Sequence, residues 1–307
     1  MGCLVRSLGS AVAFLLSAIA LRRMLEHPVS IAPPAAGQVD TVVAGVRWRS
    51  REQGGAGVPV VYVHGMLSSS TTWKKVLPSA SGGRPAVAVD LPGFGFSERP
   101  WPYDYTVGGQ AQALLAYLDR RGFDRVALVG NSLGGAVCLV VAAARPQRVA
   151  ALVLVGSASP VSRIPWNFQL LRVPVVGELE MELFVRPMML FALRYRLFAR
   201  ADRVTDETVD DWWLPIRVPG TRRAALAAVR SSARGFEDLL GRIRVPTLVL
   251  WGKEDRILPQ EEGLRLSSEI RSARLVVLPD TGHLPQEETP EEFSHAVRQF
   301  LEEVSHR

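Results

Sequence analysis

One serine of this chain stands in a setting that favours nucleophilic chemistry. Residues 130–134 read Gly-Asn-Ser-Leu-Gly around Ser132, with an apolar run before them (126–130) and a helix-forming run after the serine (133–146). Where a strand turns sharply into a helix, the residue at the turn is strained and its neighbours must be small, so that strand and helix can approach. The hydroxyl then projects beside the N–H groups of the first helical turn. The pattern predicts that Ser132 is a catalytic nucleophile.

A serine hydroxyl needs a base, which is usually histidine. The chain has five histidines, and His283 follows the last predicted strand, from which it could reach Ser132. The other four stand in the N-terminal linker, at the end of an early strand, in the last helix and in the C-terminal tail (His27, His64, His295 and His306). His283 is therefore the expected base.

The base in turn needs an acid that fixes its tautomer and stabilises the imidazolium. Asp255 comes shortly after the apolar run 246–252 and is the expected acid, with Glu254 and Asp280 as alternatives. Asp280 is only three residues before His283 and could form a local turn instead. The chain order Ser, Asp, His differs from the orders in chymotrypsin and subtilisin.

Hydrolysis through a serine also needs donors for the developing oxyanion, each of which is worth about 10²–10³ in rate. The first expected donor is the backbone N–H of Leu133, directly after the nucleophile. The second is the backbone N–H of Met66, in the loop that follows the apolar run 58–65. His64 and Gly65 then shape that loop, and His64 is not expected to act as a base.

These residues are attached to alternating strands and helices. Near-continuous apolar runs predict buried strands, preceded by a hairpin with Gly45 at its turn, and helices are expected near 106–121, 133–146 and 290–304. The strand runs are residues 58–65, 85–93, 126–130, 151–156, 246–252 and 273–280. This alternation predicts an α/β fold with a mostly parallel sheet covered by helices on both faces.

The stretch 158–240 interrupts the alternation. It lacks clean strand runs and is rich in Met, Phe and Trp, so it predicts a helical cap inserted between core segments 39–157 and 241–307. Such a layer would cover the carboxyl ends of the strands, where open α/β sheets bind ligands. Its apolar side chains are expected to pack the small helices, and some could line an apolar substrate pocket.

Residues 1–38 are expected to lie outside the fold, as a hydrophobic segment (4–21) and a Pro/Ala-rich linker (28–38). The apolar stretch falls short of the roughly 20 residues that span a bilayer, so spanning is marginal, and the first expectation is a single-pass or interfacial membrane anchor. The alternatives are a signal peptide cleaved near Ala20, or a helix packed on the domain of a cytoplasmic protein. A membrane-associated protein is the favoured expectation.

Composition excludes several other classes. The net charge is +6, but the arginines are scattered, so no nucleic-acid partner is expected. The two cysteines, Cys3 and Cys138, cannot form a disulfide framework, and no Cys/His cluster predicts a metal site. Cys138 lies in an apolar run and is expected to be a core thiol. The sequence carries no signal for oligomeric state.

Five motifs in chain order resemble those of the α/β-hydrolase superfamily, across nearly all of residues 39–307. They are His-Gly-Met (64–66), Asp-Leu-Pro-Gly-Phe-Gly-Phe-Ser (90–97), the stretch 130–135, Trp251 to Asp255, and Gly282-His283. The resemblance implies an eight-stranded sheet, a helical cap after the sixth strand, and neither a metal nor an organic cofactor.

Serine at position 132 excludes the relatives that use aspartate there. The form Asn-Ser-Leu-Gly-Gly (131–135) resembles hydrolases that cleave carbon–carbon bonds in aromatic ring-fission products. Two features depart from that group, because residues 66–70 replace its glycine-rich oxyanion loop and Leu284 replaces a tryptophan after the histidine.

Hydrolysis of a small-molecule carboxylic ester, with a small, medium or lipid-like apolar acyl group, is therefore the first expectation. C–C bond hydrolysis is the alternative, followed by peptidase, amidase, lactonase or perhydrolase activity. A catalytically idle scaffold is disfavoured, because all three members of the expected triad are present.

Overall fold

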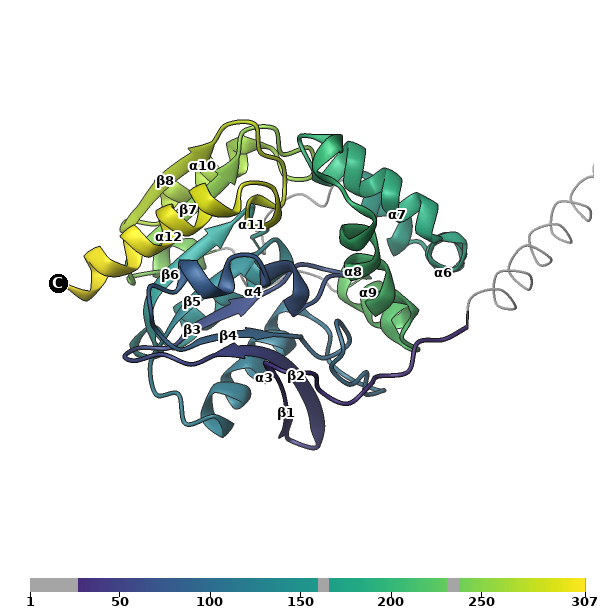
Figure 1. Ribbon diagram of the computed structural model, residues 1–307, viewed down its shortest axis with the longest axis horizontal. Coiled ribbons are helices and arrows are strands. Elements are labelled where there is room, and N and C mark those ends of the chain that lie inside the picture. Colours follow the sequence, from purple (N-terminus) through teal and green to yellow (C-terminus); the bar gives the residue numbers. More distant parts are fainter. Residues whose placement is uncertain (1–26, 160–165, 231–237, 307) are drawn as a thin grey trace, which may run out of the picture.

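The computed structural model describes residues 27–159, 166–230 and 238–306. Its centre is one eight-stranded sheet with the strand order β1-β2-β4-β3-β5-β6-β7-β8 (Figure 1). The strands are β1 (Gln38–Val43), β2 (Val46–Gln53), β3 (Val60–Val63), β4 (Ala86–Val89), β5 (Val126–Asn131), β6 (Val149–Val155), β7 (Thr247–Gly252) and β8 (Ala273–Leu278). Only β2 runs antiparallel to its neighbours, and all other pairs are parallel. The predicted mostly parallel sheet is confirmed.

Helices cover both faces of the sheet. On one face lie α3 (Val107–Arg120), α4 (Leu133–Ala144) and α10 (Gln260–Glu269), and on the other lie α2 (Leu77–Ala80) and α12 (Pro290–Ser305). Strand side chains alternate between the two layers, as the twofold period of a strand requires. Thus Val61 packs toward α3 and α4, while Tyr62 packs toward α2 and α12.

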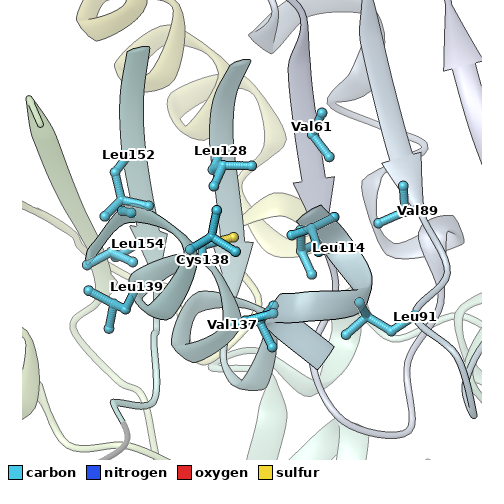
Figure 2. Close-up of a cluster of buried hydrophobic side chains, with 14 of the residues drawn as sticks. Val61, Val89, Leu91, Leu114, Leu128, Val137, Cys138, Leu139, Leu152 and Leu154 are labelled. Carbon is cyan, nitrogen blue, oxygen red and sulfur yellow. The ribbon is translucent and has the colours of Figure 1, made fainter. Parts of the chain in front are cut away.

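Figure 2 shows the larger of the two core layers, in which residues of β3 to β6 meet α3 and α4. Cys138 lies inside this layer, fully buried beside Leu128 and Leu152 in the close-up. Burial raises the pKa of its thiol, because no nearby charge compensates the loss of water. The expectation of a core thiol agrees with this setting.

Between β6 and β7 the chain forms a separate group of helices, which Figure 1 shows beyond the carboxyl ends of the strands. They are α5 (Trp166–Gln169), α6 (Val176–Leu183), α7 (Arg186–Ala192), α8 (Asp206–Arg217) and α9 (Thr221–Arg230). We call this group the cap. Met189, Phe198 and Trp212 belong to its own apolar cluster, so these side chains pack the helices against one another. Phe191, in contrast, is 60% exposed.

The described chain begins beside the cap. Two hydrogen bonds join the first described residues to the C-terminal end of α8. The guanidinium of Arg217 donates to the carbonyl of His27 at 2.5 Å, and the carbonyl of Arg217 accepts from the N–H of Val29 at 3.3 Å. The hydrophobic segment 4–21 lies outside the described residues. Within the part of the chain that the structure describes, no helix has the length and apolar character needed to cross a bilayer.

Candidate active site

Ser132 occupies the turn between β5 and α4 in a strained backbone conformation, with φ 52° and ψ −118°. A non-glycine residue rarely adopts a positive φ, and surrounding structure must hold it there. Here the Ser132 N–H donates to Val155 O at 3.1 Å, and its carbonyl accepts from the N–H groups of Gly135 at 3.0 Å and Ala158 at 3.1 Å. These bonds tie the turn to the end of β6 and to the first turn of α4.

The glycines around the serine allow this close packing. A Cβ on Gly130 would lie 2.6 Å from the carbonyl oxygen of Gly134, where α4 leaves the strand. A Cβ on Gly134 would lie 2.2 Å from the carbonyl oxygen of Val63 at the end of β3. Both distances are too short for a side chain, which supplies the steric reason for the glycine spacing.

The structure brings His283 and Asp255 together at this edge of the sheet. His283 Nδ1 lies 2.7 Å from Asp255 Oδ2, and the two side chains are only 4% and 0% exposed. The other carboxylate oxygen of Asp255 accepts the N–H groups of Ile257 at 2.8 Å and Leu258 at 3.0 Å. Because a carboxylate so bound can only accept, Nδ1 carries the proton and Nε2 is left as the basic nitrogen.

Two further contacts place this pair next to the serine turn. A Cβ on Gly156, just after β6, would lie 3.2 Å from both Asp255 Oδ2 and His283 Nδ1. The side-chain amide of Asn131 donates to Val155 O at 2.9 Å and to His283 O at 3.2 Å. The residue before the nucleophile is thus bonded to the expected base. Asn131 is part of the motif around Ser132, but the sequence does not indicate its bond to the backbone of His283.

The alternative acids take other partners. Glu254 accepts the N–H of Thr281 at 2.9 Å, and Asp280 pairs with Arg203 at 3.1 Å on the surface. Neither of them bonds to His283 in the structure. Among the three carboxylates weighed from the sequence, Asp255 is the one that contacts the histidine.

His64 is buried in the core and makes two bonds to the backbone. Its Nδ1 contacts Gly65 O at 2.6 Å, and its Nε2 accepts the N–H of Leu91 at 3.1 Å. Burial lowers its pKa, and the charge of Asp90 offsets this only in part. A neutral imidazole with both nitrogens engaged shapes the loop after β3, as the sequence analysis expects.

The expected oxyanion donors come from two segments that converge on Ser132. Leu133 is the first residue of α4, directly after the serine. Met66 follows Gly65, and a Cβ on Gly65 would lie 3.1 Å from Ser132 Cβ, so the loop after β3 passes against the nucleophile. Within the described residues, the N–H groups of Met66 and Leu133 make no hydrogen bond. Their role as donors remains a prediction.

A metal site would need a cluster of side chains that can act as ligands. No group of three or more His, Cys, Asp or Glu side chains is placed to hold a metal ion among residues 27–159, 166–230 and 238–306.

Asn131→Ala tests the bond between the serine turn and the histidine. The change removes the donor to two buried carbonyl groups, so we expect the free energy of unfolding to fall by about 1–3 kcal/mol, together with a lower kcat. Urea unfolding and steady-state rates measure the two effects. Asn131→Asp serves as a control, because it places an acceptor opposite the same carbonyls and should cost more than the alanine. If both variants kept the wild-type free energy of unfolding and the wild-type kcat, the hydrogen bonds assigned to Asn131 would be contradicted.

Comparison with known proteins agrees with this geometry. Residues 58–290 match the family model described as alpha/beta hydrolase fold. A 2-hydroxy-6-oxo-2,4-heptadienoate hydrolase of Pseudomonas putida is 33% identical, with 80% of this chain and 90% of that protein covered. Two solved structures are also similar, and each covers most of this chain.

One of these structures is a thermophilic esterase from Thermogutta terrifontis, with a TM-score of 0.74, 27% identity and coverage of 88% of this chain and 99% of that one. The other is a bacterial membrane phospholipase A, with a TM-score of 0.68, 25% identity and coverage of 99% and 97%. The family model spans most of the chain and includes strands β3 to β8, the serine turn and the histidine loop. This chain belongs to the α/β hydrolase family.

Proposed function

We propose that the protein is a serine hydrolase in which Ser132 is the nucleophile, His283 the general base and Asp255 the acid that orients it. The observation that carries this proposal is the 2.7 Å contact between His283 Nδ1 and Asp255 Oδ2 beside the strained turn at Ser132. The remaining basic nitrogen of His283 is available to take the serine proton. The family membership of the chain supports the same assignment.

The reaction follows from these positions. Ser132 Oγ attacks a carbonyl carbon while His283 Nε2 takes its proton, and Asp255 stabilises the resulting imidazolium. The N–H groups of Leu133 and Met66 donate to the oxyanion. Collapse breaks the bond to the leaving group, which takes the proton from His283 and leaves an acyl-serine. Water, deprotonated by His283, then hydrolyses that ester.

For the substrate we propose a ring-fission product in which the bond that breaks is carbon–carbon. The 33% identical relative carries such a substrate in its name, and it is covered over 90% of its length. In a 2-hydroxy-6-oxo-dienoate, movement of the hydroxyl proton to C5 gives a 2-oxo compound with a saturated C5. After serine adds to C6, the C5–C6 bond breaks and its electrons delocalise as a dienolate, which is then protonated.

Leu284 bears on this choice. A leucine after the histidine departs from the ring-fission hydrolases, but here the side chain is fully buried with Met189, Phe198 and Trp212 in the apolar cluster of the cap. Leu284 therefore serves the packing of the cap. Its presence in place of a tryptophan is a weaker argument against C–C bond hydrolysis than the sequence alone suggests.

Ester hydrolysis is the second candidate. Its support is the esterase and the membrane phospholipase A among similar structures, together with a loop at residues 66–70 that has no glycine. The acyl-serine step is the same, with an alcohol in place of the carbon leaving group. An apolar acyl group would suit the partly exposed side chains of Met66 and Leu133, near the serine turn, and of Ile257, whose N–H binds Asp255.

A substrate panel separates the two candidates. We expect 2-hydroxy-6-oxo-2,4-heptadienoate to be hydrolysed with a higher kcat/KM than p-nitrophenyl esters from acetate to decanoate. Loss of the dienoate absorbance and release of p-nitrophenol measure the rates, and Ser132→Ala should abolish both. Turnover of esters alone would exclude the C–C proposal, and turnover of neither class would exclude both.

We further propose that residues 4–21 bring the enzyme to a membrane. The supporting observations are their lack of charge apart from Arg6 and the coverage of 99% of this chain by the membrane phospholipase A.

Carbonate extraction tests whether residues 4–21 attach the protein to a membrane. The full-length protein should stay in the membrane pellet at high pH, while a variant that begins at residue 27 should move to the supernatant, because the apolar segment is gone. Mass spectrometry of the N-terminus shows whether the segment is still attached. Full-length, uncleaved protein in the supernatant would exclude both an anchor and a signal peptide.

A further inference from the structure

Two adjacent carboxyl groups lie buried just after the catalytic histidine. Glu287 and Glu288 belong to α11 (Pro285–Glu288), and burial raises the pKa of each to about 7, although the hydrogen bonds they accept act in the opposite direction. Neither residue contacts Asp255 or the serine turn. Buried carboxyl groups are costly unless they are well bonded, so the partners of each one show what it holds in place.

Glu288 accepts hydrogen bonds from the backbone on both sides of His283. Its Oε1 accepts the N–H of Gly282 at 2.9 Å and the N–H of Leu284 at 3.3 Å. Its Oε2 accepts the N–H of Ala199 at 2.6 Å. Ala199 lies in the stretch between α7 and α8, so one carboxylate joins the histidine loop to the cap.

The same stretch of the cap makes further contacts with the histidine loop. We call residues 197–203 the cap strap. Leu197 O accepts the N–H of His283 itself at 2.7 Å, and Arg203 donates to Asp280 O at 2.7 Å. The approach is so close that a Cβ on Gly282 would lie 2.5 Å from Leu197 O.

We propose that Glu288 is a positioning residue, which locks the backbone of His283 against the cap strap and thereby keeps the imidazole in line between Asp255 and Ser132. This inference rests on the proposed function of the triad. Glu288 acts through the loop alone, because its oxygens face backbone N–H groups and not the reacting atoms. A carboxylate can accept all three bonds, whereas the amide of a glutamine would turn N–H groups toward N–H donors.

Glu287 provides a matched control on the same helical turn. Its carboxylate accepts from Trp212 Nε1 at 3.0 Å and from the hydroxyl of Thr72, and it therefore joins the cap to the core without touching the histidine loop. It is also buried, and both of its bonds end on Oε1, which glutamine keeps, so Glu287→Gln controls for the loss of a buried carboxyl group on this turn.

The test is the rate of fluorophosphonate labelling of the full-length protein, which requires an activated serine but no known substrate. We expect Glu288→Gln to lower the second-order rate constant about 10²-fold, the effect of misplacing a catalytic group by about 1 Å. Glu287→Gln should stay within about threefold of the wild type. The final extent of labelling reports the folded fraction, so the rate constant is compared between folded molecules only.

A wild-type rate constant in Glu288→Gln, or equal losses in both glutamine variants, would overturn the proposal. If Glu288→Gln does not fold, Glu288→Asp decides, because it keeps the charge but draws the oxygens away from the loop: a slowed rate constant supports the proposal and an unchanged one overturns it. Failure of the wild type itself to label would instead exclude the proposed serine hydrolase function.

Discussion

The turn from β5 into α4 holds Ser132 at a positive φ, and the rest of the site depends on that one strained residue. Such a conformation costs of order 1–3 kcal/mol, so it persists only where neighbouring structure leaves no alternative. Here the backbone bonds to Val155 and Ala158 and the close approach of Gly134 to β3 supply that constraint. These contacts hold the serine at the end of the sheet, where β5 turns into α4.

The proposed base, His283, is held by a different set of contacts, which come from far apart in the sequence. Asp255 fixes the imidazole, Asn131 bonds to the His283 carbonyl, and the cap strap binds the His283 N–H. The cap is therefore attached to the histidine loop at this edge. Leu284, directly after the histidine, is also buried in the apolar cluster of the cap.

Much of the fold and of the candidate site could be predicted from the sequence, because local sequence patterns determine these features. Apolar runs of strand length and the glycines around Ser132 carry their own signal, and the predicted architecture matches the sheet. The bonds of Asn131 and Glu288 could not be predicted in the same way. Each is a side-chain contact to a backbone group brought near by the fold, and no spacing along the chain marks it. Substrate preference also depends on such contacts. The sequence alone favours esters, whereas the 33% identical relative favours C–C bond hydrolysis.

The most direct test of the triad is whether its members act as one unit. With the fastest substrate of the panel, Ser132→Ala and His283→Ala should each lower kcat by about 10⁶, and the double variant should be little slower than either one. This result is expected because neither residue has a catalytic task without the other. Losses that nearly add in the double variant would show that the two residues act independently, and would contradict the proposed mechanism.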